Sequence, residues 1–245
     1  MKAMIFAAGL GTRLRPLTND RPKALVEVAG KPMLQRVIEN LAEYGFTDIT
    51  INVHHFGEKI IDFVAENHNF GIDIHISDER NQLLDTGGGI LKARKWLDGD
   101  EPFLVHNADI LTDLNLRQFY DYHLQHSADA TLLTAHRVTA RYLMFDNANR
   151  LCGWINKTSG ESLPQGFTYQ PGEYQEMAFG GIHVISPSLF RSLESYSAEP
   201  KFSIVPFYVA MCHSLKIMSY APQGYRWFDV GKPETLALAD AAFSR

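Results

Sequence analysis

The chain has 245 residues, of which 45% are apolar and 21% charged, so it can build a sizeable core. Its formal net charge is -5 and it has no basic block, which argues against nucleic acid as a partner. Because no apolar run is long enough for a membrane helix or a signal peptide, and Cys152 and Cys212 lack a metal-type spacing, we expect a cytoplasmic protein without membrane contacts.

The first predicted element is a buried strand at residues 3–8, where six apolar residues run together. It leads into a glycine-rich loop, residues 9–23, which reads Gly-Leu-Gly-Thr-Arg-Leu-Arg-Pro-Leu-Thr-Asn-Asp-Arg-Pro-Lys. Such a turn exposes backbone N–H groups that can bind an anionic phosphate. Four cations also lie in this loop, namely Arg13, Arg15, Arg21 and Lys23. The loop therefore predicts a polyanionic ligand.

Two other nucleotide-binding patterns fit this loop poorly. A dinucleotide fingerprint starting at Gly9 and Gly11 would need a third glycine where Leu14 stands, and an acidic residue after the next strand, where His54 and His55 stand. A P-loop would need a Gly-Lys-Ser/Thr sequence that is missing. Hydride chemistry is therefore disfavoured.

The following segments alternate between predicted strands and helices, which is typical of an α/β protein with a doubly wound, Rossmann-like and mostly parallel sheet. Up to residue 135 we expect strands at 49–53, 72–76, 103–105 and 130–135, and helices at 32–44, 60–64, 90–97 and 116–124. Beyond residue 136 we expect strands at 142–145, 151–155, 178–185, 217–220 and 227–230, and helices at 187–193, 204–212 and from Pro233 onward. Residues 157–175 are rich in Gly, Pro, Ser and Tyr and read as a mobile loop.

Two aspartates follow predicted strands in different halves of the chain. Asp109 ends the segment His-Asn-Ala-Asp, and Asp229 lies in Trp-Phe-Asp-Val-Gly. Either alone would also suit a turn or a cap. A shared site for Mg²⁺ explains the pair better than two independent caps, because hard oxygen ligands suit that ion.

Thr86 is followed by three consecutive glycines, Gly87, Gly88 and Gly89, before the predicted helix at 90–97. Each glycine in a first turn costs about 1 kcal/mol relative to alanine. We therefore expect that another group approaches the backbone at these glycines so closely that a side chain would not fit.

The loop pattern Gly-x-Gly-Thr-Arg-x-x-Pro-x-Thr, with Pro-Lys four residues on, resembles the signature of the sugar-phosphate nucleotidyltransferases, or NDP-sugar pyrophosphorylases. Residues 84–90, Leu-Asp-Thr-Gly-Gly-Gly-Ile, are similar to a segment of the uridylyl and guanylyl transferases that lies against the nucleobase. The resemblance covers nearly the whole chain and is strongest at 1–110 and 226–236. It implies one domain over 1–245, without the C-terminal β-helix of some relatives.

The same resemblance implies that residues 1–135 bind the nucleotide, 136–225 the sugar phosphate, and that 226–245 add the second metal aspartate and a terminal helix. Within the first part it assigns catalytic roles to Arg13, Lys23 and Asp109, with Lys23 on the α-phosphate and Arg13 on the departing phosphates. Ala108 stands where the family has glycine. The residues implied around the nucleotide are Ala8, Gly9, Gly11, Thr12, Arg13, Lys23, Gly87, Gly88 and Asn107. The implied metal ligands are Asp109 and Asp229.

For the sugar phosphate, the resemblance implies Lys157, Glu176 and Gly181. Lys157 matches a family lysine only roughly, because Asn156 and Thr158 depart from the usual pattern. Gly181, in Phe-Gly-Gly-Ile, matches a glycine under the sugar ring, and Glu176 would accept hydrogen bonds from hydroxyls.

The implied reaction is transfer of a nucleotidyl group from an NTP to a sugar 1-phosphate, with Mg²⁺ and release of pyrophosphate. The compact length and the Leu-x-Thr-Gly-Gly-Gly segment look most like the N-acetylmuramic acid 1-phosphate uridylyltransferases of cell-wall recycling. Mannose 1-phosphate guanylyltransferase, glucose 1-phosphate transferases and a cytidylyl transferase stay open as alternatives. So do a catalytically silent nucleotide-sugar sensor and a Rossmann oxidoreductase, and a homo-oligomer is possible.

Overall fold

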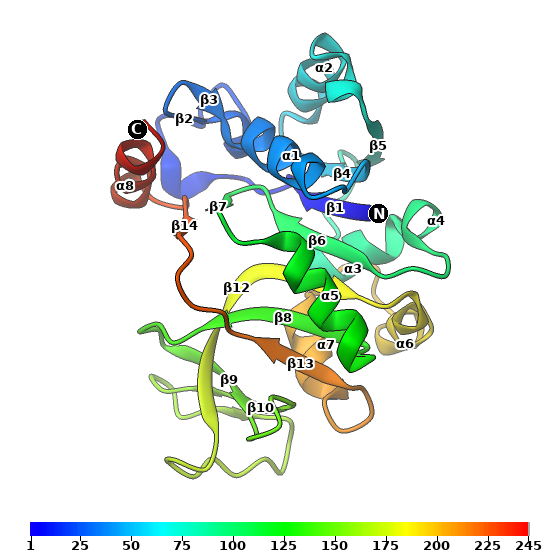
Figure 1. Cartoon of the computed structure of the whole chain (residues 1–245), viewed down its shortest axis with the longest axis vertical. Helices are drawn as coiled ribbons and strands as arrows, with labels where there is room; N and C mark the ends of the chain where they lie inside the picture. Colours follow the sequence, from blue (N-terminus) through cyan, green and yellow to red (C-terminus); the bar gives the residue numbers. More distant parts are fainter. Residues whose placement is uncertain (245) are drawn as a thin grey trace.

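The computed structural model describes residues 1–244, which form a mixed sheet with helices on both faces (Figure 1). In chain order the strands are β1 (Lys2–Phe6), β2 (Glu27–Val28), β3 (Lys31–Pro32), β4 (Asp48–Val53), β5 (Asp73–Asp78), β6 (Phe103–Asn107), β7 (Ile110–Thr112), β8 (Ala130–Ala135), β9 (Arg141–Phe145), β10 (Leu151–Asn156), β11 (Ser162–Leu163), β12 (Gln175–Ile185), β13 (Ile217–Tyr220) and β14 (Trp227–Asp229). The helices are α1 (Met33–Glu43), α2 (Gly57–Glu66), α3 (Asp85–Lys92), α4 (Arg94–Leu97), α5 (Leu116–His126), α6 (Phe190–Tyr196), α7 (Ile204–Met211) and α8 (Pro233–Phe243).

Within these residues ten strands join in one sheet, in the order β11-β10-β9-β12-β6-β1-β4-β5, with β8 attached to β12 and β13 to β8. The α/β class is confirmed, but continuous parallel pairing runs only from β5 through β4 and β1 to β6, with a second parallel pair formed by β8 and β13. Beyond β6 it is mixed, because the long strand β12 runs antiparallel to β6, β8 and β9. The prediction of a mostly parallel sheet therefore describes the first half of the chain.

Two helical layers follow from the alternation of side chains along the buried strands. In β1, Ala3 and Ile5 face one core, with residues of α1, α2, α5 and α8, whereas Met4 faces the other, with residues of α3, α4, α6 and α7. Helix α1 likewise buries one face, which carries its apolar residues at helical spacing: Leu34, Val37, Ile38 and Leu41. One sheet thus separates two cores.

Most predicted elements lie where the sequence places them, within a few residues. One difference concerns the glycines, because α3 begins at Asp85 and so includes them. Another is the segment 157–175, where residues 162–163 pair with β10 as the short strand β11. None of the helices in residues 1–244 has both the length and the hydrophobicity that crossing a bilayer requires.

A short antiparallel ribbon of β7 and β14 joins the segment after β6 to the C-terminal part of the chain; the sequence predicts the strand at 227–230, but neither β7 nor this pairing. Ile110 pairs with Asp229, and the Val230 N–H donates to the carbonyl oxygen of Asp109 at 2.8 Å. Because β7 is only three residues long, it carries no recognisable periodicity. The ribbon brings Asp109 and Asp229 side by side on the backbone.

Candidate active site

The site begins where the adjacent parallel strands β1 and β6 end together. Phe6 pairs in register with Asn107, so the glycine-rich loop and the segment that contains Asp109 leave the sheet as neighbours. The Lys23 ammonium makes an ion pair with the Asp109 carboxylate, and both side chains are largely buried. The carboxyl ends of the strands therefore carry the functional groups, as this type of sheet predicts.

The glycine-rich loop is folded back on itself. Gly11 has a φ of 65°, and a Cβ there would lie 2.9 Å from the Lys23 Cβ, so only glycine fits. The Thr18 hydroxyl donates to the Gly11 carbonyl oxygen at 2.9 Å. Leu14, at the position that breaks the dinucleotide fingerprint, is fully buried and anchors the short helical turn at residues 12–14. Gly9, by contrast, has no neighbouring atom within 4 Å of a Cβ position.

A buried polar chain ties this loop to helix α3. The Ala7 N–H donates to the Asn52 side-chain oxygen at 2.8 Å, and the Asn52 amide donates to Glu79 at 2.8 Å. The other Glu79 oxygen accepts from the Leu84 N–H at 3.0 Å. Sequence reasoning missed this chain, although a polar Asn52 inside an apolar strand was a usable sign. It fixes the position of the glycine-rich loop relative to the start of α3.

A cavity of about 380 Å³ lies between these walls. Several residues predicted to bind the nucleotide or metal line it, as do Asn52, Asp85 and Thr86. The predicted residues on its wall are Ala8, Gly9, Lys23, Asn107 and Asp109. Gly11 and Thr12 belong to the loop but not to the wall, and Arg13 points into a second cavity.

Two of the three glycines of α3, Gly87 and Gly88, pack against the segment at residues 200–202. A Cβ on Gly87 would lie 2.3 Å from the Phe202 ring, and one on Gly88 would lie 2.1 Å from the carbonyl oxygen of Pro200. The N–H groups of both glycines donate to the Phe202 carbonyl oxygen, at 2.8 and 3.2 Å. The bare backbone is thus required by the segment at residues 200–202, and Asp85 and Thr86 face the cavity in place of Gly87 and Gly88.

Asp229 lies beside Arg13 and Gly231. A Cβ on Gly231 would be 2.8 Å from both the Arg13 guanidinium and the Asp229 carboxylate, so the glycine lets these two side chains approach. One carboxylate oxygen of Asp229 is buried without a hydrogen-bond partner among residues 1–244. A buried carboxylate oxygen without a partner fits a cation, and Asp109 offers the second carboxylate.

These two aspartates would have to share a metal with the substrates. The part of the chain that the structure describes contains no group of three or more His, Cys, Asp or Glu side chains arranged for a metal. Mg²⁺ accepts few protein ligands and takes the rest from phosphates and water, so the pair is sufficient. The donor set therefore fits the predicted ion.

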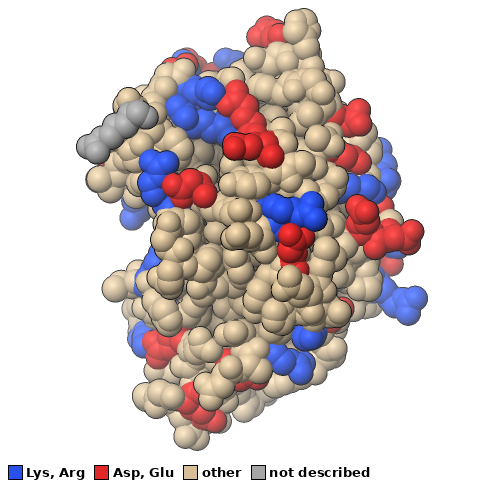
Figure 2. Space-filling view, viewed as in Figure 1, with Lys and Arg blue, Asp and Glu red and all other residues tan. Residues whose placement is uncertain are grey.

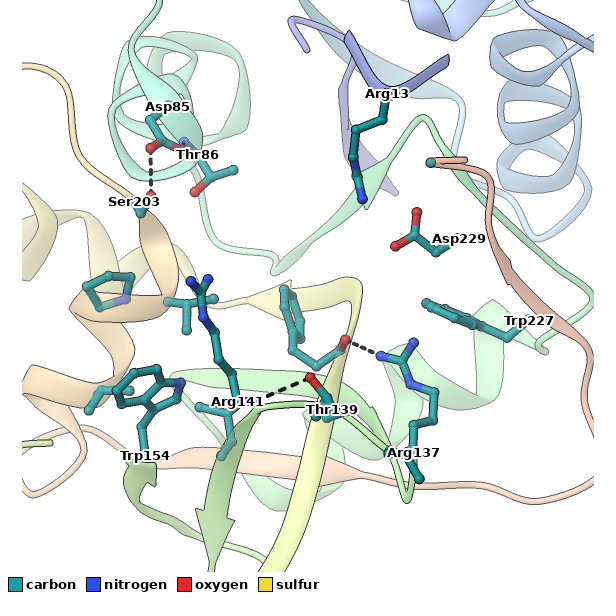
Figure 3. Close-up of a pocket in the computed structure, with 18 of the residues that line it drawn as sticks. Arg13, Asp85, Thr86, Arg137, Thr139, Arg141, Trp154, Ser203, Trp227 and Asp229 are labelled. Atoms are coloured by element: carbon teal, nitrogen blue, oxygen red, sulfur yellow. Dashed lines mark hydrogen bonds between the residues drawn. The ribbon is translucent and has the colours of Figure 1, made fainter. Parts of the chain in front are cut away.

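A second cavity of about 920 Å³ adjoins the first and shares Asp85 and Thr86 with it. Figure 3 shows that Arg13 and Asp229 lie at one end of it, with Arg137 and Trp227 below them. The Arg137 guanidinium lies 3.8 Å from the centre of the Trp227 ring and donates to the Phe179 carbonyl oxygen at 2.6 Å. Sequence reasoning found neither Arg137 nor Trp227.

Arg137 retains unused hydrogen-bonding capacity. Its Nε is buried and, among the described residues, has no partner. Burial lowers the pKa of its guanidinium, and the nearby Asp229 carboxylate acts in the opposite direction. A guanidinium held by stacking next to the aspartates is well placed to bind a phosphate.

The residues predicted for the sugar phosphate lie apart from this cavity. Lys157 makes an ion pair with Glu176, which also accepts a hydrogen bond from the Tyr169 hydroxyl. Neither Lys157 nor Glu176 lines either of the two cavities. Gly181, with a φ of 75°, packs under the site, because a Cβ there would lie 2.9 Å from the Asn107 amide.

The surface view shows no dominant basic face, since Lys and Arg are interspersed with Asp and Glu over the visible side (Figure 2). The cations that matter for an anionic ligand are those inside the two cavities. On the visible side, positive charge is therefore not gathered into a basic patch.

Comparison with known proteins agrees with this geometry. Residues 2–244 match the family described as Nucleotidyl transferase. The chain is 32% identical to N-acetylmuramate alpha-1-phosphate uridylyltransferase of Caulobacter vibrioides, over 98% of the chain and 95% of that protein. It is 31% identical to mannose-1-phosphate guanyltransferase of Schizosaccharomyces pombe over 96% of the chain, but it spans only 62% of that relative.

Solved structures share the fold. HddC from Yersinia pseudotuberculosis, complexed with GMP-PN, superposes with a TM-score of 0.76 at 24% identity over 99% of both chains. A UDP-glucose pyrophosphorylase complexed with UDP-glucose gives a TM-score of 0.78 at 19% identity, over 99% of this chain and 98% of that one. The resemblance found in the sequence is confirmed: the chain belongs to the nucleotidyl transferase family of enzymes.

Proposed function

We propose that this protein transfers a uridylyl group from UTP to N-acetylmuramic acid 1-phosphate, forming a UDP-sugar and releasing pyrophosphate. The observation that carries the proposal is the pair of adjoining cavities, with Lys23 and Asp109 on the wall of one and Arg13 and Asp229 on the wall of the other. One cavity would hold the nucleotide and the other the sugar phosphate. The cationic and carboxylate groups lie where the two substrates would meet.

The choice of substrates rests on the extent of the match to relatives. The uridylyltransferases of Caulobacter vibrioides and Neisseria meningitidis are covered over 95% and 99% of their length, whereas the guanyltransferase of Schizosaccharomyces pombe is covered over 62%. Mannose 1-phosphate guanylyl transfer is therefore the second candidate, and a glucose 1-phosphate substrate the third. The favoured pair would place the enzyme in the cytoplasm, in the recycling of cell-wall sugars.

In the proposed reaction an oxygen of the sugar 1-phosphate attacks the α-phosphorus of UTP. A new P–O bond forms as the bond between the α-phosphorus and the bridging oxygen breaks, and pyrophosphate leaves with the electron pair. The attacking phosphate is already an anion, so no side chain needs to remove a proton. The protein's task is then to hold the two phosphates in line and to neutralise their charge.

Each cation has a place in this scheme. Lys23, at the end of the glycine-rich loop, would bind the α-phosphate in exchange for its contact with Asp109. Arg13, beside Asp229, would stabilise the charge that develops on the pyrophosphate. Arg137, stacked on Trp227, would bind the phosphate of the sugar. Asp109 and Asp229 would hold Mg²⁺, which when bound neutralises phosphate charge.

The test is a matrix of pyrophosphate-release assays that combines ATP, CTP, GTP and UTP with N-acetylmuramic acid, N-acetylglucosamine, mannose and glucose 1-phosphates. We expect UTP with N-acetylmuramic acid 1-phosphate to give the highest kcat/KM, and chelation of Mg²⁺ to abolish release. A higher kcat/KM for GTP with mannose 1-phosphate would select the second candidate.

Folded protein that binds UTP but releases no pyrophosphate with any acceptor would favour the sensor. A catalytically silent sensor needs only a pocket that binds the nucleotide sugar. It would therefore give no role to the full set of Arg13, Lys23, Asp109 and Asp229. Binding of NAD without binding of any NTP would instead support the oxidoreductase alternative.

A further inference from the structure

The large cavity is lined by two cations that the phosphate chemistry does not use, Lys232, which follows Asp229 closely in the chain, and Arg141, which comes from a different wall. Arg141 begins β9, and Figure 3 shows its side chain extending from that strand into the cavity. Its backbone N–H donates to the Thr139 hydroxyl at 3.3 Å. Within residues 1–244 its guanidinium has no ion pair and no hydrogen bond. An arginine that projects into a cavity without a partner is available to a ligand.

The surroundings of Arg141 are those of a sugar site and not of the phosphate centre. Leu143 lies two residues further along β9 and lines the same cavity, and it pairs in register with Trp154 of β10. These side chains form an apolar floor on which the face of a sugar ring or its substituents can pack. Arg141 adds a charge to that floor.

Arg137 and Arg141 occupy different parts of the cavity. Figure 3 shows Arg137 next to Trp227 and Asp229, while Arg141 lies on the side of Trp154, with Thr139 between the two arginines. Arg137 is held by its stacking on Trp227 and its bond to Phe179, so it stays with the aspartates. A ligand that engages both arginines needs two separated groups of acceptor oxygens, and anionic groups bind a guanidinium most strongly.

We propose that Arg141 binds a carboxylate carried by the sugar, and that the acceptor is therefore an acidic sugar 1-phosphate. This inference rests on the proposed function, which it deepens by naming the specificity-determining residue. N-acetylmuramic acid 1-phosphate has such a carboxylate on its lactyl ether, whereas mannose 1-phosphate and glucose 1-phosphate have only the phosphate. Arg141 is exposed and lines the cavity, and its guanidinium favours the first class through a charge-assisted, bidentate hydrogen bond.

The experiment compares two acceptors that differ only in the lactyl group, N-acetylmuramic acid 1-phosphate and N-acetylglucosamine 1-phosphate. For the Arg141→Ala variant we expect the preference for the acidic acceptor, measured as the ratio of the two kcat/KM values, to fall roughly 10- to 100-fold. The loss should lie mainly in KM, because the carboxylate is bound equally before and during the reaction. Arg141→Lys should restore part of the preference.

Arg150→Ala is the matched control, because Arg150 lies in the turn between β9 and β10 and lines neither cavity. This variant should keep the wild-type ratio. An unchanged ratio in Arg141→Ala, including one in which both acceptors lose equally, would overturn the inference.

Calorimetric titration of the two sugar 1-phosphates separates this inference from the proposed function. Suppose that the wild type binds the acidic sugar more tightly, that Arg141→Ala abolishes this difference, and that neither protein shows turnover. In that case the inference stands and the proposed function fails. If turnover of the acidic acceptor is normal in Arg141→Ala, the proposed function stands and the inference fails.

Discussion

Replacement of Asp109 by asparagine is expected to lower kcat at least about 100-fold while the protein stays folded. Asparagine keeps the shape of the side chain but removes the charge that pairs with Lys23 and that would hold Mg²⁺. Because the positions of the two phosphates depend on these charges, the loss should fall on the chemical step more than on nucleotide binding. Initial rates of pyrophosphate release at saturating substrates measure this effect.

The control for this prediction is Asp121→Asn, which removes a carboxylate from an exposed ion pair with Arg117 on α5. Surface pairs of this kind contribute little to stability, so this variant should retain wild-type activity and melting temperature. Near-normal turnover in Asp109→Asn, with the same fold and melting temperature, would contradict the assignment of the metal to Asp109 and Asp229.

The largest expected effect on stability is a loss on mild acidification, caused by three buried histidines. Burial lowers the pKa of His106 and of His123 to about 4, and that of His183 to about 3. His106 donates to the Asn107 carbonyl oxygen, His123 is hydrogen-bonded to Thr131 and Ser186, and His183 to Tyr208. All three are therefore held neutral in the folded protein.

The sign of this pH dependence follows from the number of protons that the folded and unfolded states bind. In the unfolded chain a histidine takes up a proton near pH 6.5, well before these folded-state histidines do, so the unfolded state binds more protons below that pH. Their contribution to stability is fully present above about pH 6.5 and is lost progressively as the pH falls toward 4. Each histidine contributes a slope of up to about 1.4 kcal/mol per pH unit to the free energy of unfolding.

Denaturant titrations between pH 7.5 and 4.5 measure this dependence. We expect the free energy of unfolding to fall steeply below pH 6.5, and the slope to decrease by about a third in a His183→Gln variant, whatever the absolute stability of that variant. A free energy of unfolding that stays constant between pH 7 and 5 would contradict the prediction.

The sequence predicts the segments that line the smaller cavity, because each of them is contiguous. The apolar run before Gly9, the loop that ends at Lys23, and the strand before Asp109 each show their element in local composition. Their convergence follows from a general rule, since adjacent parallel strands end at one edge of the sheet. The pairing of Asp109 with Asp229 was inferred from the recurrence of an aspartate after a strand, and the β7–β14 ribbon supplies its structural cause.

The larger cavity is harder to predict from the sequence because its walls come from distant segments. Arg137 and Trp227 are 90 positions apart. They come into contact because Arg137 follows β8, Trp227 follows β13, and these two strands pair in parallel. The direction of β12 cannot be predicted from the sequence either, since a buried strand has the same apolar composition whether it runs parallel or antiparallel to its neighbours. The glycines of α3 were identified as special, but the reason, the backbone of residues 200–202, lies more than 100 positions away.

The most direct test of the account follows the oxygens of the sugar phosphate through the reaction. N-acetylmuramic acid 1-phosphate, labelled with ¹⁸O in its non-bridging phosphate oxygens, is incubated with unlabelled UTP, Mg²⁺ and the enzyme. The masses of both products are then measured by mass spectrometry. If the sugar phosphate attacks the α-phosphorus, all of the label stays in the UDP-sugar and the pyrophosphate is unlabelled. Label in the pyrophosphate, or no UDP-sugar from folded protein that binds UTP, would contradict the account.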